Sequence, residues 1–401
     1  MRNSWRVTMA LFALTGVIES LAFGHLGAFT PLFLRELGVA ETAIPRWTGI
    51  LGSLGFVLGL PLLPFWAVWA DRYGRKLIIV RSAYVEAVLF GLAALSQNVW
   101  MLVAARFLTG FVLGNTGVML AAQSETTPRQ RIGTALGLIS AGPVLGMALG
   151  PVIGGEVVYQ VGIRALLGLD AALTLLMGIV LTVTLREAPR PPIAQTSVWA
   201  SIGAAGRNIV QQPVVVRLFV LDFLISLAVT MAGPYIPLRI EELYRGDALA
   251  RTIGRVLTVS GLAMAVTTPF WGRLGDRIGF LRVLRVAVIG VAVACAGQAL
   301  SVTLWQFGGW RLLQGLLQGG TSAMVIALIT VVVAQERRAA VLNFARLPAQ
   351  LSWFLGPLAA TAVAQFSLSA VFGAGAVLLA GAALLLWLPG VLGRTTMNSL
   401  P

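Results

Sequence analysis

Apolar runs of about 20 residues follow one another along this chain almost without interruption. Only 11% of its 401 residues are charged, whereas soluble domains carry about 25%. A run of this length crosses the hydrocarbon core of a bilayer as an α-helix, because a helix bonds its own backbone polar groups. The sequence therefore predicts an all-α integral membrane protein.

Polar residues and Gly/Pro clusters divide the chain into twelve predicted spans, six on each side of one linker. The predicted limits are 7–34, 46–70, 77–96, 99–123, 131–160, 164–186, 214–240, 252–274, 282–303, 305–334, 339–365 and 369–392. The stretch from Glu187 to Gln212 is richer in Pro, Arg, Gln and Ser than its surroundings. We predict an N-terminal six-helix bundle at 1–186, a cytoplasmic linker at 187–213, and a C-terminal six-helix bundle with a short tail at 214–401.

One motif recurs half a chain later and indicates an internal duplication. Residues 64–76 read Pro-Phe-Trp-Ala-Val-Trp-Ala-Asp-Arg-Tyr-Gly-Arg-Lys, and residues 269–280 read Pro-Phe-Trp-Gly-Arg-Leu-Gly-Asp-Arg-Ile-Gly-Phe. Asp71 matches Asp276 at 276 − 71 = 205, and Gly150 matches Gly356 at 356 − 150 = 206. Two offsets this close predict two homologous, pseudo-symmetric bundles.

The formal net charge of +14 is explained better by membrane topology than by nucleic-acid binding. The arginines sit in short loops between spans rather than on one basic face. Most fall on the side that holds the N-terminus, although the 239–255 cluster is an exception. Cytoplasmic loops carry an excess of Lys and Arg. We therefore predict a multi-pass protein of the bacterial plasma (inner) membrane with both termini in the cytoplasm and no nucleic-acid partner.

Ionisable residues at the centre of a spanning helix cost at least about 2.5 kcal/mol, so each is a functional candidate. Glu19 lies near the middle of the first predicted span. Burial disfavours a charged carboxylate, so its protonation can change with conformation. We predict that Glu19 carries protons and cations while Arg106 favours proton release; a static Glu19–Arg106 ion pair is the alternative. Asp222 is either a coupling residue, with Arg311 as its partner, or an end-of-helix pair.

The loop after the second predicted span carries a family resemblance. Residues 70–76 read Ala-Asp-Arg-Tyr-Gly-Arg-Lys, which resembles the G-x-L-A-D-R-x-G-R-K motif of the major facilitator superfamily. The resemblance covers nearly the whole chain and is closest to the twelve-helix drug:proton antiporters, including their multidrug efflux members. The sequence departs from the motif at Ala67 and Trp69, where glycine and leucine are usual. The second copy keeps Gly272 but has Phe280 and Leu281 in place of the basic pair.

The resemblance implies that this loop is a cytoplasmic gate. Arg75 would pair with an acid at the end of the fourth span, for which Glu125 is the candidate. The alternative is a positive-inside anchor with a helix cap. The predicted gate residues are Asp71, Arg72, Gly74, Arg75, Lys76 and Glu125, with Gly272, Asp276, Arg277 and Gly279 in the second copy.

The fifth predicted span fits the antiporter motif G-x8-G-x3-G-P-x2-G-G. Glycines at this spacing let helix backbones approach closely, and the proline adds a bend. The resemblance implies a hinge helix at the interface of the two halves that is typical of exporters; generic small-residue packing is the alternative. The motif residues are Gly137, Gly146, Gly150, Pro151, Gly154 and Gly155.

Three further polar residues lie in predicted spans. The third and sixth spans are expected at the periphery of the fold, and an arginine precedes each acid. Snorkelling or local pairing is therefore the favoured interpretation of Glu86 and Asp170. His25 lies about 240° round the helix from Glu19, so we expect a polar residue at the cavity mouth.

These features predict a proton-driven exporter of lipophilic, often cationic compounds. The expected partners are the small-molecule substrate, protons and the bilayer; no cofactor or metal is expected, and we predict a monomer. Export or uptake of a metabolite such as a sugar or siderophore is the alternative. A membrane enzyme is disfavoured because the chain has one histidine, one cysteine and no nucleotide-binding loop. A sensor without transport is disfavoured because the loop and hinge motifs are retained.

Overall fold

The computed structural model describes residues 4–186, 211–333, 341 and 344–387, with only the backbone described at Pro64, Ala67 and Asp71. Every regular element in this part of the chain is a helix. Twelve of the described segments are long and apolar enough to cross a membrane, which confirms the predicted fold class. Most of the predicted linker, residues 187–210, lies outside the described residues.

The chain forms two compact units. Among the described residues, the first unit comprises 4–44, 54–186 and 248–258, and the second comprises 45–53, 211–247 and the rest from 259 onward. The main division between the units falls between residues 186 and 211. In addition, the start of the second span groups with the second unit, and the start of the eighth span groups with the first.

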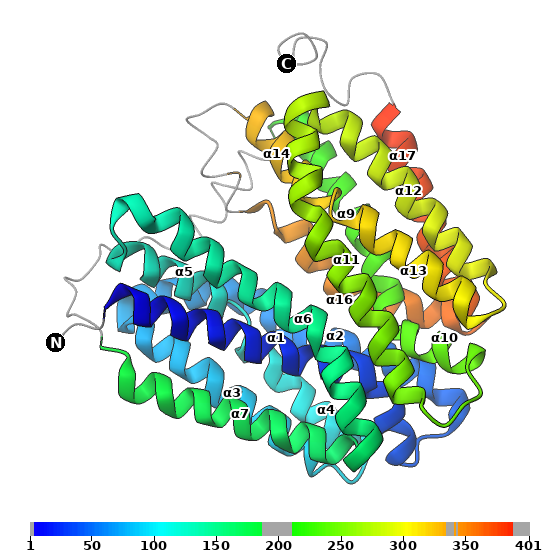
Figure 1. Ribbon diagram of the computed structural model, residues 1–401, viewed down its shortest axis with the longest axis horizontal. Coiled ribbons are helices and arrows are strands. Elements are labelled where there is room, and N and C mark those ends of the chain that lie inside the picture. The colour runs from blue at the N-terminus through cyan, green and yellow to red at the C-terminus, as the bar shows by residue number, and fades with distance from the viewer. Residues whose placement is uncertain (1–3, 187–210, 334–340, 342–343, 388–401) are drawn as a thin grey trace. The chain divides into compact units, whose positions relative to one another are not determined.

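In the first unit two pairs of helices pack along each other (Figure 1). Helix α1 (Trp5–Glu36) lies against α6 (Ile132–Val161), and α3 (Arg75–Ala94) lies against α7 (Ile163–Thr184). The remaining elements are η1 (Glu41–Ala43), most of α2 (Ile44–Tyr73), α4 (Val99–Phe107), η2 (Leu108–Phe111), α5 (Asn115–Thr126) and η3 (Arg129–Arg131). Their shared core is apolar and includes Phe12, Ile79, Met119, Ile139 and Leu181.

In the second unit α9 (Pro213–Ala232) packs along α16 (Leu347–Ala364), and α12 (Phe280–Leu300) packs along α17 (Leu368–Trp387). The remaining elements are η4 (Gly233–Tyr235), α10 (Ile236–Leu243), most of α11 (Leu249–Ile278), α13 (Leu304–Gln318) and α14 (Ser322–Val332). Its core includes Leu218, Leu284, Val288, Leu328 and Leu379.

The duplication extends to the helix caps. The side chains of Asn98 and Thr303 each accept a hydrogen bond from the backbone N–H three residues on, at 3.0 and 3.3 Å. Gly74 links α2 to α3 and Gly279 links α11 to α12, with φ values of +100° and +92°. Both pairs obey the offset found in the sequence, since 303 − 98 = 205 and 279 − 74 = 205.

Large apolar side chains lie on the outer surface of the helices. Val293, Val377 and Leu384, which lie within α12 and α17, are 51%, 72% and 70% exposed. Such exposure would be costly in water but suits side chains that face lipid tails. The surface therefore agrees with the sequence in predicting a protein embedded in a bilayer.

Three of the predicted spans are interrupted, the fourth and tenth near their middles and the seventh closer to its end. The fourth is divided into α4, η2 and α5, the seventh into α9, η4 and α10, and the tenth into α13 and α14. Glycines mark the breaks, at Gly114, at Gly233 and at 319–320. Inside a membrane such breaks leave backbone groups to be satisfied by other partners, and transporters place binding sites at them.

Candidate functional site

The site is built around a buried carboxylate on α1. Glu19 is 8% exposed, and its Oε1 accepts a hydrogen bond from Asn115 Nδ2 at 2.5 Å. A buried carboxylate needs hydrogen-bond donors to remain charged. The amide of Asn115 therefore stabilises the ionised form of Glu19.

The break in the fourth span positions Asn115. Helix α4 ends at Phe107, and α5 begins at Asn115 after Gly114 adopts a left-handed conformation with φ +93°. This conformation favours glycine. The first turn of α5 thus starts beside Glu19, and the partial positive charge of a helix N-terminus adds to the amide in favouring an anion there.

Glu86 on α3 is a second buried acid at this site. It is 0% exposed, and neither of its carboxyl oxygens has a hydrogen-bond partner among the described residues. The predicted snorkelling or local pairing is therefore wrong, because the carboxyl group is neither exposed nor hydrogen-bonded among the described residues.

The two acids lie at the same level of the first unit. Glu86 is close enough to Glu19 for a direct electrostatic interaction. Phe23 and Phe90 follow these acids by 23 − 19 = 4 and 90 − 86 = 4 residues, and their ring centroids lie 5.7 Å apart. The sequence could not show this proximity, because it depends on which faces of α1 and α3 meet.

Arg106, the predicted fixed cation, lies half-buried in the last turn of α4. It therefore precedes the same break that Asn115 follows. The fourth span thus carries an arginine before the break and an amide donor after it, and the amide donates a hydrogen bond to Glu19.

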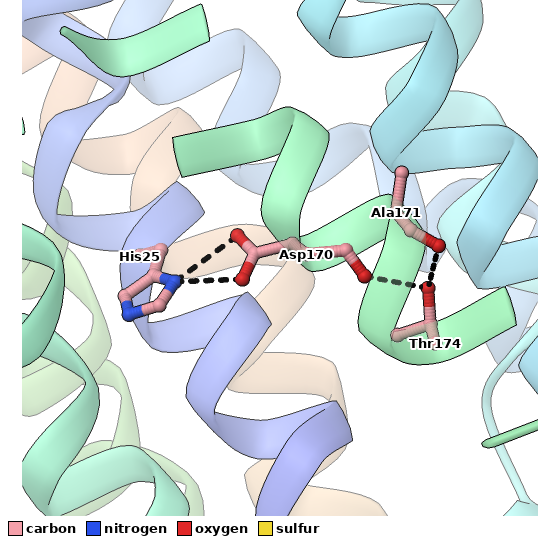
Figure 2. Close-up of polar contacts among 4 residues, drawn as sticks. All are labelled: His25, Asp170, Ala171 and Thr174. Carbon is pink, nitrogen blue, oxygen red and sulfur yellow. Dashed lines mark hydrogen bonds and ion pairs between the residues drawn. The ribbon is translucent and has the colours of Figure 1, made fainter. Parts of the chain in front are cut away.

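His25 and Asp170 form a second buried polar pair in the first unit, which the sequence prediction missed (Figure 2). His25 Nδ1 lies 2.9 and 3.0 Å from the two carboxyl oxygens of Asp170, and both side chains are 1% exposed. The backbone carbonyl of Asp170 accepts a hydrogen bond from Thr174 Oγ1 at 2.8 Å. Asp170 thus pairs with a side chain on α1 rather than with the preceding Arg164, which pairs with Glu36. His25 lies inside the unit rather than at a cavity mouth.

The glycines of the α6 motif pack this helix against α1. A Cβ atom added at Gly150 would lie 2.8 Å from the carbonyl oxygen of Leu21, and one added at Gly154 would lie 2.5 Å from the His25 ring. A Cβ atom added at Gly146 would lie closer still to the backbone carbonyl oxygen of Val17. These glycines therefore allow α6 to contact the helix that carries both Glu19 and His25.

The other motif positions have different surroundings. Pro151 is buried within α6, whereas Gly137 is exposed and has no atom within 4 Å of an added Cβ. Gly155 packs against the carbonyl of Ala250 at the start of α11, also in the first unit. The role of α6 as a hinge remains a prediction.

The predicted gate loop contains the expected ion pair. Arg75 Nη2 lies 2.6 Å from Glu125 Oε1, with the two side chains 11% and 48% exposed. Lys76 Nζ donates to the carbonyl oxygen of Thr182 at 2.7 Å. The side chain of Asp71 lies outside the described residues, and Arg72, Asp276 and Arg277 are exposed. Gly272 has no atom within 4 Å of an added Cβ, and Gly74 and Gly279 link the helices as described above.

The charged candidates of the second unit do not pair with each other. Asp222 is buried on α9, at 5% exposed. Arg311 Nη1 donates instead to Gln314 Oε1 at 2.7 Å. Gln314 also accepts from Gln298 Nε2 at 2.7 Å and donates to Gln318 Oε1 at 3.2 Å. The predicted Asp222–Arg311 pairing is therefore wrong, and Arg311 instead contacts one member of an amide network formed by Gln298, Gln314 and Gln318.

Comparison with known proteins agrees with the architecture. The family model of the Major Facilitator Superfamily matches residues 12–249 and 218–394. Multidrug resistance protein MdtG of Serratia proteamaculans is 30% identical over 377 residues, which cover 92% of this chain and 90% of that protein. MdtG of Citrobacter koseri is 29% identical over 375 residues, covering 92% and 91%.

Solved structures of transporters share the fold. The nucleoside transporter NupG superposes with a TM-score of 0.79 at 11% identity, covering 94% of this chain and 98% of that one. A bacterial homologue of the human lysosomal transporter Spinster superposes with a TM-score of 0.76 at 15% identity, covering 100% and 98%. With its twelve spans, its duplicated halves and a family model matched over nearly its whole length, this chain belongs to the Major Facilitator Superfamily of membrane transporters.

Proposed function

We propose that this chain exports lipophilic, often cationic, small molecules in exchange for protons by alternating access. The observation that carries the proposal is the buried Glu19, held by Asn115 at a break in a spanning helix. Burying an acid in a membrane protein is costly, so an acid at such a position is a functional candidate. A carboxyl group at such a site can bind either a proton or a cation, which is the exchange that an antiporter requires.

The proposed cycle runs on competition at Glu19. A lipophilic cation binds the carboxylate after its proton leaves, and a proton arriving from the opposite side releases the cation. In the proposed cycle Arg106 approaches Glu19 and favours proton loss, because a positive charge beside a carboxylate stabilises its ionised form. The proton gradient supplies the energy, so the cycle needs no cofactor.

Export, rather than uptake, is supported by two observations. The MdtG relatives are named multidrug resistance proteins. The fifth span matches the exporter-type glycine motif at each of its fixed positions, and three of these glycines pack α6 against the helix that carries Glu19.

We further propose a monomer in the bacterial inner membrane with both termini in the cytoplasm, where the Arg75–Glu125 pair acts as a gate latch. An N-terminal tag should then resist protease added to spheroplasts, in which the outer face of the inner membrane is accessible. The variants Arg75→Glu and Glu125→Arg should each lose transport, and their combination should restore part of it. A latch is excluded if the double variant is no better than either single variant.

The amide network of the second unit favours one second candidate, a carrier of a polar metabolite such as a sugar or siderophore. Gln298 and Gln314 are 0% and 1% exposed and bond each other, and Gln314 also bonds Arg311 and Gln318. Amide groups recognise hydroxyl groups well. A sugar panel therefore belongs in the same transport assay.

The test is transport by purified protein in liposomes under an imposed pH gradient, with ethidium and several sugars as substrates. We expect gradient-driven ethidium transport by the wild type and its loss in Glu19→Gln. Glu41→Gln is the matched control, since Glu41 is 66% exposed and pairs with Arg35 at the surface. Gradient-driven movement of a sugar but not of ethidium would favour the second candidate. If no compound moves with the gradient, proton-coupled transport is refuted.

A further inference from the structure

Arg311 is a cation in a spanning helix, and no acid among the described residues balances its charge. It lies on α13, within the tenth span, and its side chain is half-buried. Among the described residues its guanidinium makes one hydrogen bond, from Nη1 to Gln314 Oε1, and its Nε is buried without a partner. Gln314 is neutral, so this bond leaves the positive charge uncompensated. Charges inside a membrane are costly, and they pair with an opposite charge or mark a substrate or ion pathway.

The described acids of the second unit do not supply the missing counter-ion. They are Asp222, Glu241, Glu242, Asp247 and Asp276. None of them forms an ion pair with Arg311, and Glu242 pairs with Arg239 instead. The described part of this unit therefore leaves the guanidinium available to an anion that does not belong to it.

Arg311 points into the unit rather than toward lipid. It shares one face of α13 with Gln314 and Gly315, which are both buried. Gly315 packs this face closely against the backbone of α11. Leu312 and Leu316, about 100° and 140° round the helix from Arg311, are each 37% exposed. A snorkelling arginine would turn toward the start of α13, whereas Arg311 bonds Gln314 on the following turn.

The amide network holds the guanidinium in place. Gln314 Oε1 accepts hydrogen bonds from Arg311 Nη1 and Gln298 Nε2, each at 2.7 Å. Gln314 Nε2 in turn donates to Gln318 Oε1 at 3.2 Å. A guanidinium has five N–H donors in a planar fork that matches a carboxylate, and Gln314 occupies only Nη1. The arginine is thus oriented in advance, with donors left for a ligand.

We propose that Arg311 is a second binding site, which takes the carboxylate of a lipophilic organic acid. Gln314 is its positioning residue, because it orients the guanidinium without neutralising it. Cys295 and Leu317, each three residues from a glutamine of the network, belong to the hydrophobic core or pack against it, which suits a ligand with an apolar body. The inference goes beyond the proposed function, which assigns cations and protons to Glu19, and it does not require proton exchange there.

The first test is ligand binding by the purified protein in an uncharged detergent. The fluorescent probes are dansylglycine, which carries a carboxylate, and dansylglycinamide, which carries a neutral amide in its place. The wild type should bind dansylglycine about tenfold more tightly or better, because an arginine–carboxylate contact is charge-assisted. Arg311→Gln should bind both probes alike. Arg282→Gln, which removes an exposed arginine at the start of α12, should keep the wild-type preference.

Two outcomes of this test overturn the proposal. One is equal binding of the two probes by the wild type, which would mean that water alone satisfies the arginine. The other is a preference for dansylglycine that survives in Arg311→Gln.

A competition experiment identifies the source of the anion. Benzoate should displace dansylglycine from the wild type, whereas benzamide and phosphatidylglycerol should not. Displacement by phosphatidylglycerol but not by benzoate would show that the site binds a lipid headgroup, and the proposal would be wrong.

The second test keeps the arginine and gives it a partner within the chain. Gln314→Glu places a carboxylate where the amide lies, so it should abolish the preference for dansylglycine. Gln306→Glu is the matched control, since it adds the same charge at an exposed position of α13, and it should bind as the wild type does. A Gln314→Glu variant that keeps the preference contradicts the proposal. This comparison decides the question even if Arg311→Gln does not fold.

Failure of this site and failure of the proposed function give different results. If binding of dansylglycine depends on Arg311 but no compound follows the pH gradient in liposomes, the proposed exchange fails and the anion site stands. If ethidium follows the gradient but the wild type binds both dansyl probes alike, the exchange stands and the anion site fails.

Discussion

At the scale of single residues, the buried acids of the first unit differ in how their charge is compensated. Asp170 faces the ring nitrogen of His25 at 2.9 Å. Glu19 has one amide donor, and Glu86 has none among the described residues. Compensation of this kind decides whether an acid is structural or can exchange a proton. The fully paired Asp170 fits a structural role, whereas the singly bonded Glu19 fits exchange.

The His25–Asp170 pair should stabilise the contact between α1 and α7. His25→Leu leaves a buried carboxyl group without its partner, which typically costs about 3–5 kcal/mol. Replacing both residues by leucine removes the unpaired group. We therefore expect the double variant to unfold at a higher temperature than His25→Leu. The measurement is thermal unfolding of the purified protein in detergent; strictly additive losses in the two single variants and the double variant would contradict this role.

At the scale of elements, the sequence predicted the spans but not their breaks. Apolar length and polar loops located the twelve segments, because burial in lipid depends on composition along the chain. The interruption at Gly114 depends on a left-handed backbone at one residue. Glycine is also common in unbroken membrane helices. The presence of Gly114 in the sequence therefore did not predict that this span is interrupted there.

Only part of the candidate site could be predicted from the sequence. Glu19 stood out because an acid in an apolar run is rare, and the Arg75–Glu125 contact followed from the family motif. The pairing of His25 with Asp170 and the meeting of Glu86 with Glu19 both require knowledge of helix rotation. The rotation of each helix about its own axis cannot be predicted here, because nearly every face of these helices is hydrophobic.

The motif glycines of α6 offer a matched test of close packing. Gly146 faces the α1 backbone, whereas Gly137, on the same helix, has open space around it. Gly146→Ala should cost about 1–3 kcal/mol through overpacking, and Gly137→Ala should be neutral or stabilising by up to about 1 kcal/mol. Thermal unfolding of both variants checks this difference. Equal losses would show that the motif is needed for something other than the α1 contact.

At the scale of the whole molecule, the two halves share a fold but not the acid site. At the offsets found in the sequence, Glu19 corresponds to Ile225 (19 + 206 = 225) and Glu86 to Val291 (86 + 205 = 291). Both are buried in the apolar core of the second unit. The duplication has therefore kept the helix framework in both units, and the carboxyl pair is specific to the first.

The central claim, that a proton and a cation compete for Glu19, is tested most directly by proton release on substrate binding. Ethidium is added to the purified protein in weakly buffered detergent solution, and the change in pH is recorded. We predict that the wild type and the surface control Glu41→Gln release protons, while Glu19→Gln releases none. Proton release by Glu19→Gln equal to that of the wild type would contradict the account.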